Sequence, residues 1–246
     1  MTTDFTLEPL AEDALLLRFG NGIDAETNAR VHAAAQALRA TNLPGILEVA
    51  PAYATLLVRF NPAHWSDIES ADPFARLATA LKSNVDPGLR RDDEQQHALR
   101  GHEEACAIEI PVCYGGEFGP DLGAVADHAR LTSDEVIARH TSVAYTVAML
   151  GFAPGFPYLL GLDTALHMPR RANPRTRVPA GSVAIGGAQT GIYPRELPGG
   201  WQLLGCTPLA LFDPERDPPC LFTPGDRVRF RAIAAGEFAR LLEPRT

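Results

Sequence analysis

Glycine and proline make up 18 of the 58 residues from Gly151 to Pro208, and this density limits what the chain can fold into. Such a composition is typical of disorder, but aromatic side chains such as Phe156, Tyr193 and Trp201 supply surface to bury. The stretch therefore predicts ordered, tightly turned loops on short strands. Loops of this kind are where a rigid scaffold often carries its binding or catalytic groups.

Charge limits the classes of partner. The 246 residues carry a formal net charge of −8, and the resulting field repels nucleic acids and anionic membranes. The stretch from Gly151 to Pro208 differs, because it carries a net charge of +3 while the rest of the chain carries −11. We therefore expect no nucleic-acid or membrane partner, and a locally cationic surface that suits a small anion.

The four cysteines, at positions 106, 113, 206 and 220, have no CxxC spacing. With no recognisable signal peptide, this pattern predicts reduced thiols and a cytoplasmic protein. The apolar runs are far shorter than the roughly 20 residues that cross a bilayer. The histidines lack the spacing of metal ligands, so we expect no metal site.

The chain has a single lysine, Lys82, in a segment that predicts an amphipathic helix. A Walker A loop, a biotin attachment site and a pyridoxal enzyme each need a lysine at a defined place. Lys82 is far along the chain from the glycine- and proline-rich stretch. We therefore expect none of these three chemistries, and no biotin on this chain.

Residues 1–88 predict an N-terminal α+β domain. Apolar strands are expected at 14–19, 46–50 and 54–60, with a hairpin between the last two. Asp24 is a good N-cap for a helix whose apolar residues repeat as far as position 38. Apolar residues from 68 to 81 predict another helix, with Pro73 in its first turn. This β-α-β-β-α order resembles a ferredoxin-like unit.

Residues 89–105 are polar and charged and predict a linker, so residues 106–246 are expected to form the second domain. Residues 107–112 alternate like a strand, and Asp121 is expected to cap a helix. Thr132 and Glu135 match a capping box for a further helix that ends at His140. Short β segments between glycine and proline turns then indicate a β-barrel.

Linked motifs in the second domain carry a family resemblance. They run from Gly151-Phe152-Ala153-Pro154-Gly155-Phe156-Pro157-Tyr158-Leu159 through Pro169-Arg170, Pro174-Arg175, Val178-Pro179-Ala180-Gly181-Ser182-Val183 and Gln189-Thr190-Gly191-Ile192-Tyr193-Pro194 to Pro198-Gly199-Gly200-Trp201. This series resembles the family of the 5-oxoprolinase B subunit, also named kinase A inhibitor KipI and allophanate hydrolase subunit 1, with carboxyltransferase subdomains C and D. Cys206 departs from the family, which commonly has arginine or lysine before this Thr-Pro pair.

The resemblance implies an N-terminal α+β domain followed by a cyclophilin-like β-barrel. It also implies two partners in a heteromeric 5-oxoprolinase complex, the KipA-like C subunit together with the A subunit, which opens 5-oxoproline to L-glutamate at the expense of ATP. ATP would bind in the assembled complex, and this chain would be inactive alone. Two alternatives stay open: a KipI-like inhibitor of a sensor histidine kinase, and a subunit of a urea or allophanate amidolyase system.

Charged residues give the catalytic candidates. A guanidinium holds two phosphate or carboxylate oxygens at once, so Arg170 and Arg175, each after a proline, are candidates, with salt bridges as the alternative. His140 is a candidate general acid or base, or carboxylate ligand, because its ordinary pKa is near neutral pH. A capping or structural role is the alternative for this histidine.

Neutral and aromatic residues complete the expected site. Paired glycines let backbone amides approach a ligand, with tight barrel corners as the alternative. The expected substrate- or phosphate-binding residues are Gln189, Thr190, Tyr193, Gly186 and Gly187. The aromatic residues expected to line a groove or an interface, or in the case of Trp201 the core, are Phe152, Phe156, Tyr158 and Trp201.

Overall fold

The computed structural model describes residues 5–66, 73–85 and 107–243. The chain divides into two compact units, Met1–His102 and Glu103–Thr246, and each has a hydrophobic core of its own. The expected α+β class with a C-terminal β-barrel is confirmed. The expected linker at 89–105 lies outside the described residues, so the domain boundary stays a prediction.

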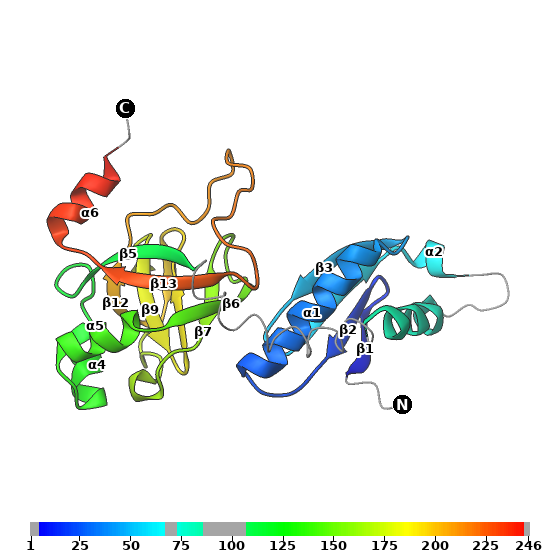
Figure 1. The fold of residues 1–246 in the computed structure, drawn as a ribbon, viewed down its shortest axis with the longest axis horizontal. Helices are drawn as coiled ribbons and strands as arrows, with labels where there is room; N and C mark the ends of the chain where they lie inside the picture. Colours follow the sequence, from blue (N-terminus) through cyan, green and yellow to red (C-terminus); the bar gives the residue numbers. More distant parts are fainter. Residues whose placement is uncertain (1–4, 67–72, 86–106, 244–246) are drawn as a thin grey trace. The chain divides into compact units, whose positions relative to one another are not determined.

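The N-terminal unit is a four-stranded antiparallel sheet with helices. Its strands lie in the order β1-β2-β4-β3, and helix α1 packs against β3 and β4 (Figure 1). Residues 73–85 form a further helix, on which Lys82 is exposed. The bounds of the named elements are β1 Thr6–Ala11, β2 Ala14–Arg18, α1 Ala25–Thr41, β3 Ile46–Pro51, β4 Thr55–Phe60 and α2 Pro62–Trp65.

Local sequence explains much of this unit. Asp24 caps α1, because its carboxylate accepts a hydrogen bond from the Thr27 backbone N at 2.7 Å, and α1 ends at Asn42 in the left-handed conformation. The three predicted strands and their hairpin are confirmed. Strand β1 is not predicted, because it is largely exposed and lacks apolar alternation. The ferredoxin-like description of the unit stays a prediction.

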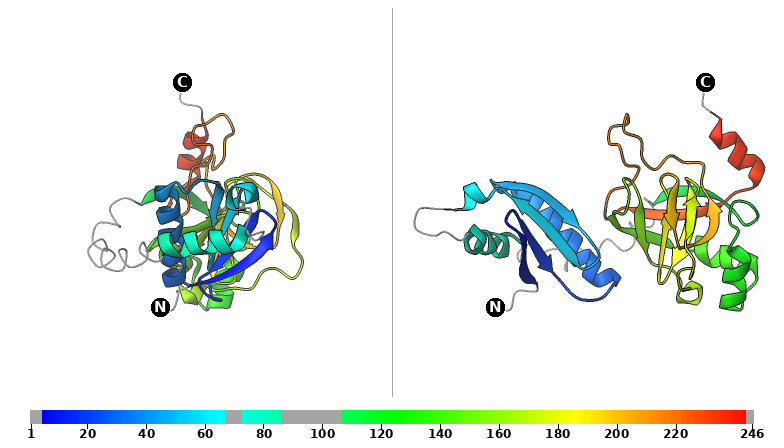
Figure 2. Two further views of the ribbon diagram at one scale, coloured as in Figure 1. Left: turned by 90° about the vertical axis from the view of Figure 1, so that its right-hand side faces the viewer. Right: turned by 180° about the vertical axis from the view of Figure 1, so that it is seen from behind.

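Seven strands close into a barrel in the second unit. Their order is β10-β7-β6-β13-β5-β12-β9, and β13 runs parallel to β5. Figures 1 and 2 show this barrel from opposite sides. The strand bounds are β5 Ile108–Tyr114, β6 Ala144–Leu150, β7 Pro157–Leu160, β9 Ser182–Gly186, β10 Gln189–Ile192, β12 Gln202–Cys206 and β13 Arg227–Ala232.

Alternation along the strands separates the inside of the barrel from its outer face. In β9, Val183 and Ile185 belong to the main core of the unit, so Ser182 and Ala184 point to the other side. Cys206 of β12 pairs with Ser182, and Cys113 of β5 pairs with Cys206. Small side chains therefore gather on the outer face of β5, β12 and β9.

Helices extend from the barrel. In α4 (Leu122–Ala129) and α5 (Ser133–Thr141), apolar residues join the main core, and the predicted capping box is present. Thr132 Oγ1 accepts from Glu135 N at 3.2 Å, and the Glu135 carboxylate accepts from Thr132 N at 2.7 Å. A short 3-10 helix covers Thr164–Leu166. The C-terminal helix α6 (Ala235–Leu242) is not predicted by the sequence analysis.

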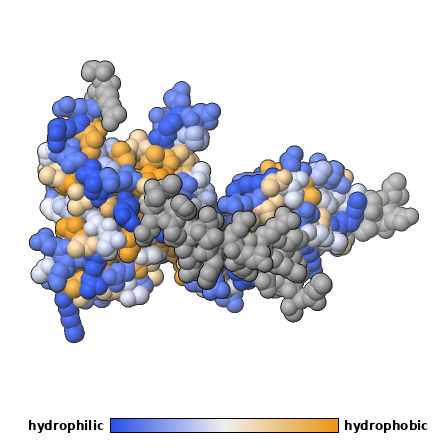
Figure 3. Space-filling model, viewed as in Figure 1, coloured by the Kyte–Doolittle hydropathy of each residue, from blue (hydrophilic) through white to orange (hydrophobic). Residues whose placement is uncertain are grey.

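A two-stranded ribbon lies against the barrel. It pairs β8 (Arg175–Val178) with β11 (Leu197–Gly199), and its Val178 shares a buried cluster with Ala184 and Leu203 of the barrel. Figure 3 shows hydrophilic and hydrophobic residues interspersed over one face of the molecule. No helix within the described ranges has both the length and the apolar character that a membrane span requires.

Candidate functional site

Asp121, a buried carboxylate, ties the loop before α4 to the β8 ribbon and to β12. The residue is 5% exposed. Its two oxygens accept hydrogen bonds from Arg175 Nη1 and Nη2, both at 2.8 Å, and Arg171 Nη1 donates at 3.1 Å. The backbone N of Leu203 donates at 2.8 Å. Asp121 is the N-cap residue of α4, as expected, but its carboxylate makes no cap hydrogen bond to the helix.

The surrounding donors hold Asp121 in its charged form. Burial by itself would raise its pKa, but hydrogen bonds from Arg175 and the Leu203 backbone, and the charges of Arg175 and Arg171, outweigh burial. The pKa of Asp121 is therefore below its ordinary value. Arg175 donates both of its Nη groups to Asp121, which favours a structural role for this arginine. Its expected catalytic role stays a prediction.

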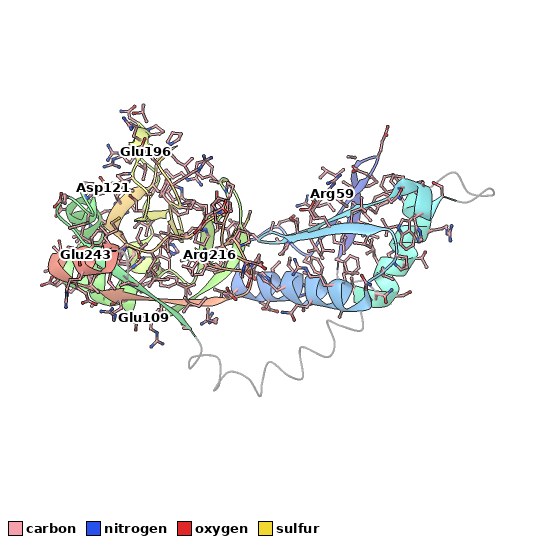
Figure 4. The ribbon with its side chains drawn as sticks, turned by 90° about the horizontal axis from the view of Figure 1, so that it is seen from above. Arg59, Glu109, Asp121, Glu196, Arg216 and Glu243 are labelled. Atoms are coloured by element: carbon pink, nitrogen blue, oxygen red, sulfur yellow. The ribbon has the colours of Figure 1, made fainter. Side chains whose placement is uncertain are left out.

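A pocket of about 280 Å³ opens beside this ion pair, on the outer face of β9 and β12. Phe118 and Phe238 contribute apolar lining, with ring centroids 4.7 Å apart, and Phe238 comes from α6. Figure 4 shows Asp121 and Glu196 on one side of this unit and Glu109 on the other. Further lining residues are Glu117, Arg175, Arg177, Ser182, Leu203 and Cys206.

The polar groups of the pocket differ in their partners. Ser182 is 2% exposed, and its hydroxyl has no hydrogen bond to another described residue. Arg177, with 77% of its side chain exposed, donates through Nε to Glu196 at 2.7 Å. Burial raises the pKa of the Cys206 thiol to about 11, so this thiol stays protonated at neutral pH. The pocket thus offers hydrogen-bond donors and no thiolate nucleophile.

Four of the expected aromatic and binding residues form one cluster beneath the ribbon. The Phe156 ring centroid lies 4.8 Å from that of Tyr158, 5.2 Å from Tyr193 and 5.8 Å from Trp201. The Arg170 guanidinium carbon lies 5.6 Å from the Trp201 ring centroid, a cation–π contact. Phe156, Tyr193 and Trp201 are buried, so this cluster packs as core more than as an open groove.

Phe152 and Gly186 border this aromatic cluster, with the Phe152 ring centroid 5.5 Å from that of Phe156. Phe152 is 61% exposed and has a positive φ of 67°, an uncommon conformation for a bulky side chain. Gly186 lies under Trp201, since an added Cβ would be 2.8 Å from the indole ring. Gly187 has φ +66° and bridges to Met168. These contacts explain on structural grounds why glycine is present at both positions. The expected ligand-binding role of the two glycines stays a prediction.

His140 lies inside the barrel with 0% exposure. Its Nδ1 is 2.7 Å from Tyr114 Oη, and its Nε2 is 3.0 Å from Thr190 Oγ1. Thr190 Oγ1 donates to the Ala184 carbonyl at 3.0 Å, so it accepts the proton of Nε2 and leaves Nδ1 to accept from Tyr114. Burial lowers the pKa of His140 to about 3. This placement favours a structural role, and the expected catalytic role stays a prediction.

The expected site residues therefore fall into separate places. His140 and Thr190 are in the barrel interior, Arg170 is beside the aromatic cluster, and Arg175 is at the pocket. Gln189, at the start of β10, is 8% exposed. Within the described ranges, no three histidine, cysteine, aspartate or glutamate side chains group as a metal site requires.

Sequence reasoning missed most of the pocket. Phe238 lies on the unpredicted helix α6, although the spacing of Phe238, Leu241 and Leu242 is a helical signal that could have indicated it. Ser182 stands inside a family motif, and its alternation with the apolar Val183 and Ile185 is a signal that could have placed its side chain on the outer face. Phe118 lines the pocket and contacts Phe238, which is 120 positions away in the sequence, so no local signal indicates this contact.

A family comparison bears on both units together. The model of the carboxyltransferase domain, subdomain C and D, matches residues 5–222. The chain belongs to this family. The matched range includes the N-terminal sheet and most of the barrel, so the expected resemblance is confirmed. Cys206, where a departure from the family is expected, lines the pocket.

Similar proteins within this carboxyltransferase family share one name. The 5-oxoprolinase B subunit of Bacillus subtilis (strain 168) is 42% identical over 241 residues, 97% of this chain and 97% of that protein. The 5-oxoprolinase B subunit of Escherichia coli O157:H7 is 43% identical over 221 residues, 90% of this chain and 93% of that protein.

Solved structures carry the same fold within longer chains. TTHA0988 matches with a TM-score of 0.73 and 39% identity, over 91% of this chain and 40% of that chain. The Kluyveromyces lactis urea amidolyase matches with a TM-score of 0.69 over 96% of this chain and 15% of that chain. At 20% identity the second likeness shows the fold alone. This chain thus covers less than half of the length of either solved chain.

Proposed function

We propose that this chain is the B subunit of an ATP-dependent 5-oxoprolinase, a heteromeric hydrolase that opens 5-oxoproline to L-glutamate. The observation that supports it is the 42% identity with the 5-oxoprolinase B subunit of Bacillus subtilis over 97% of both chains. Such an extent includes both units of the fold, not one shared module. The proposal places the chain in the cytoplasm, where ATP is available.

The chemistry of lactam opening suits a cationic surface. A lactam carbonyl is a poor electrophile, and transfer of a phosphoryl group from ATP to its oxygen activates it for attack by water. Overall, 5-oxoproline, ATP and two waters give L-glutamate, ADP and phosphate. Positioning and charge neutralisation dominate such reactions. Arg170, which stacks on Trp201, and Arg177, whose side chain is largely exposed, are the guanidinium groups of this unit that could take part.

A complex is part of the proposal. The relatives are named as the B subunit of their enzyme, which supports assembly with other proteins, and we propose the KipA-like C subunit together with the A subunit as the partners. In TTHA0988 the matching fold fills 40% of a longer chain, so there further protein is attached covalently. A separate protein can supply the corresponding neighbour here.

The urea amidolyase alternative has less support. A putative urea carboxylase of Emericella nidulans is 27% identical over 55% of this chain and 12% of that protein. None of the relatives named above favours the KipI-like kinase inhibitor.

Reconstitution tests the proposal. The chain, mixed with candidate C and A subunits, should hydrolyse ATP only when 5-oxoproline is present, with L-glutamate and ADP formed in equal amounts. Omission of this chain should abolish the coupled reaction, and L-proline should not replace 5-oxoproline. If the full mixture hydrolyses ATP at the same rate with and without 5-oxoproline, the proposal is wrong.

A further inference from the structure

The pocket on the outer face of β9 and β12 has the size of a small-molecule site. Its volume of about 280 Å³ lies just below the usual range of ligand pockets, which begins near about 300 Å³. This suits a compact metabolite better than a nucleotide. Its lining is mainly apolar, with a few polar groups, and such groups usually fix the orientation of a bound ligand.

Three polar side chains of the pocket have hydrogen-bonding capacity left. Arg177 donates a hydrogen bond from Nε to Glu196. Its two Nη groups can therefore bind the two oxygens of a ligand carboxylate. Ser182 is almost fully buried, and its hydroxyl has no partner among the described residues. Because Ser182 lines the pocket, this hydroxyl is open to a ligand atom there. Glu117 forms no ion pair with another described residue.

The charge around the pocket argues against a multiply charged ligand. Arg175 is neutralised by Asp121, and Arg177 faces Glu196. Glu117 adds a negative charge to the lining. This balance does not favour a multiply charged phosphate group. It suits one carboxylate at Arg177, next to a neutral body that can also donate a hydrogen bond to Glu117.

We propose that this pocket binds a small lactam carboxylate, the class of 5-oxoproline, and this rests on the proposed function. Arg177 holds the ligand carboxylate, and the Ser182 hydroxyl donates to the lactam carbonyl oxygen. Glu117 accepts the lactam N–H, and the apolar ring face packs on Phe118 and Phe238. The site is thus assigned to this chain, with α6 as one of its walls.

Kinetics of the assembled complex with Arg177→Ala test the assignment. The affected contact is a charged hydrogen-bonding pair, so KM for 5-oxoproline should rise about 10- to 100-fold. Inhibition by 2-pyrrolidinone, a lactam without a carboxylate, should change less than about twofold, since it lacks the group that Arg177 holds. Arg195→Ala is the matched control, because it removes an exposed arginine of the same stretch outside the pocket.

The outcomes separate the pocket from the function. If the wild-type complex shows coupled turnover and the two variants, Arg177→Ala and Arg195→Ala, have the same KM for 5-oxoproline, the assignment of the pocket is wrong. The proposed function is then unaffected. If the wild-type complex shows no coupled turnover, the proposed function fails, and calorimetric titration of the full chain with 5-oxoproline decides the pocket. Binding that Arg177→Ala weakens and Arg195→Ala does not supports the pocket, and any other titration result overturns it.

Discussion

At the scale of the residue, surroundings decide what His140 can do. The ring stacks on Phe230 with centroids 4.5 Å apart, and both ring nitrogens have partners inside the barrel. No carboxylate is among those partners, so nothing offsets the cost of burying a charged imidazolium. The sequence offers the residue type and its place in the last turn of α5, but the barrel around it is assembled from strands far along the chain. A catalytic histidine and a buried one therefore look alike in sequence.

His140 should make the barrel unit less stable in acid. Its folded pKa of about 3 lies below its ordinary 6.5, so its stabilisation is complete above pH 6.5 and is lost as the pH falls. Between pH 7 and pH 5 the free energy of unfolding should drop by about 2 kcal/mol from this residue alone. Denaturant titrations of wild type and His140→Gln at both pH values measure the difference in slope.

Nuclear magnetic resonance gives an independent check should His140→Gln fail to fold. In the wild-type chain, the imidazole ¹⁵N shifts of His140 should report a neutral ring with the proton on Nε2 down to pH 5. His128, which is exposed on α4, is the internal reference. Protonation of His140 above pH 5 contradicts the argument.

At the scale of the element, Asp121 holds three segments together. Asp121→Asn should destabilise the barrel unit by about 3 to 5 kcal/mol, because it leaves the Arg175 charge partly buried without its partner. Glu109→Gln is the control, since its pair with Arg231 is exposed and such pairs contribute about 0 to 1 kcal/mol. Denaturant unfolding followed by near-ultraviolet circular dichroism measures both. Equal losses in the two variants would contradict the role of Asp121.

Elements set by local sequence were predictable, and those set by distant contacts were not. The cap at Asp24 and the capping box at Thr132 depend on residues three apart, so both are visible in the sequence. Asp121 looks like a third cap by the same rule, yet Arg175, 54 residues away, takes its carboxylate. The parallel pairing of β5 with β13 joins the first barrel strand in the sequence to the last one. It has no local signal either.

At the scale of the whole molecule, each unit has a complete core. Leu15, Leu56 and Phe60 belong to the core of the first unit, whereas Ile110, Val183 and Phe230 belong to the core of the second. The sequence indicated this division through the polar and charged run between them. What it could not supply is the place where the pocket forms, since α6 and the loop before α4 meet only in the folded barrel.

Separate cores predict separate folding. A fragment of residues 103–246 should fold alone, because its strands close the barrel without any strand from residues 1–102. Its ¹H–¹⁵N spectrum should overlay that of the full chain except near the new terminus, and its melting temperature should lie within about 2 to 4 °C of the full chain's, a change of about 1 kcal/mol. A fragment of residues 1–102 is the counterpart and should show its own cooperative transition. An unfolded 103–246 fragment would mean that the first unit completes the barrel's stability, and the expected domain boundary would then be wrong.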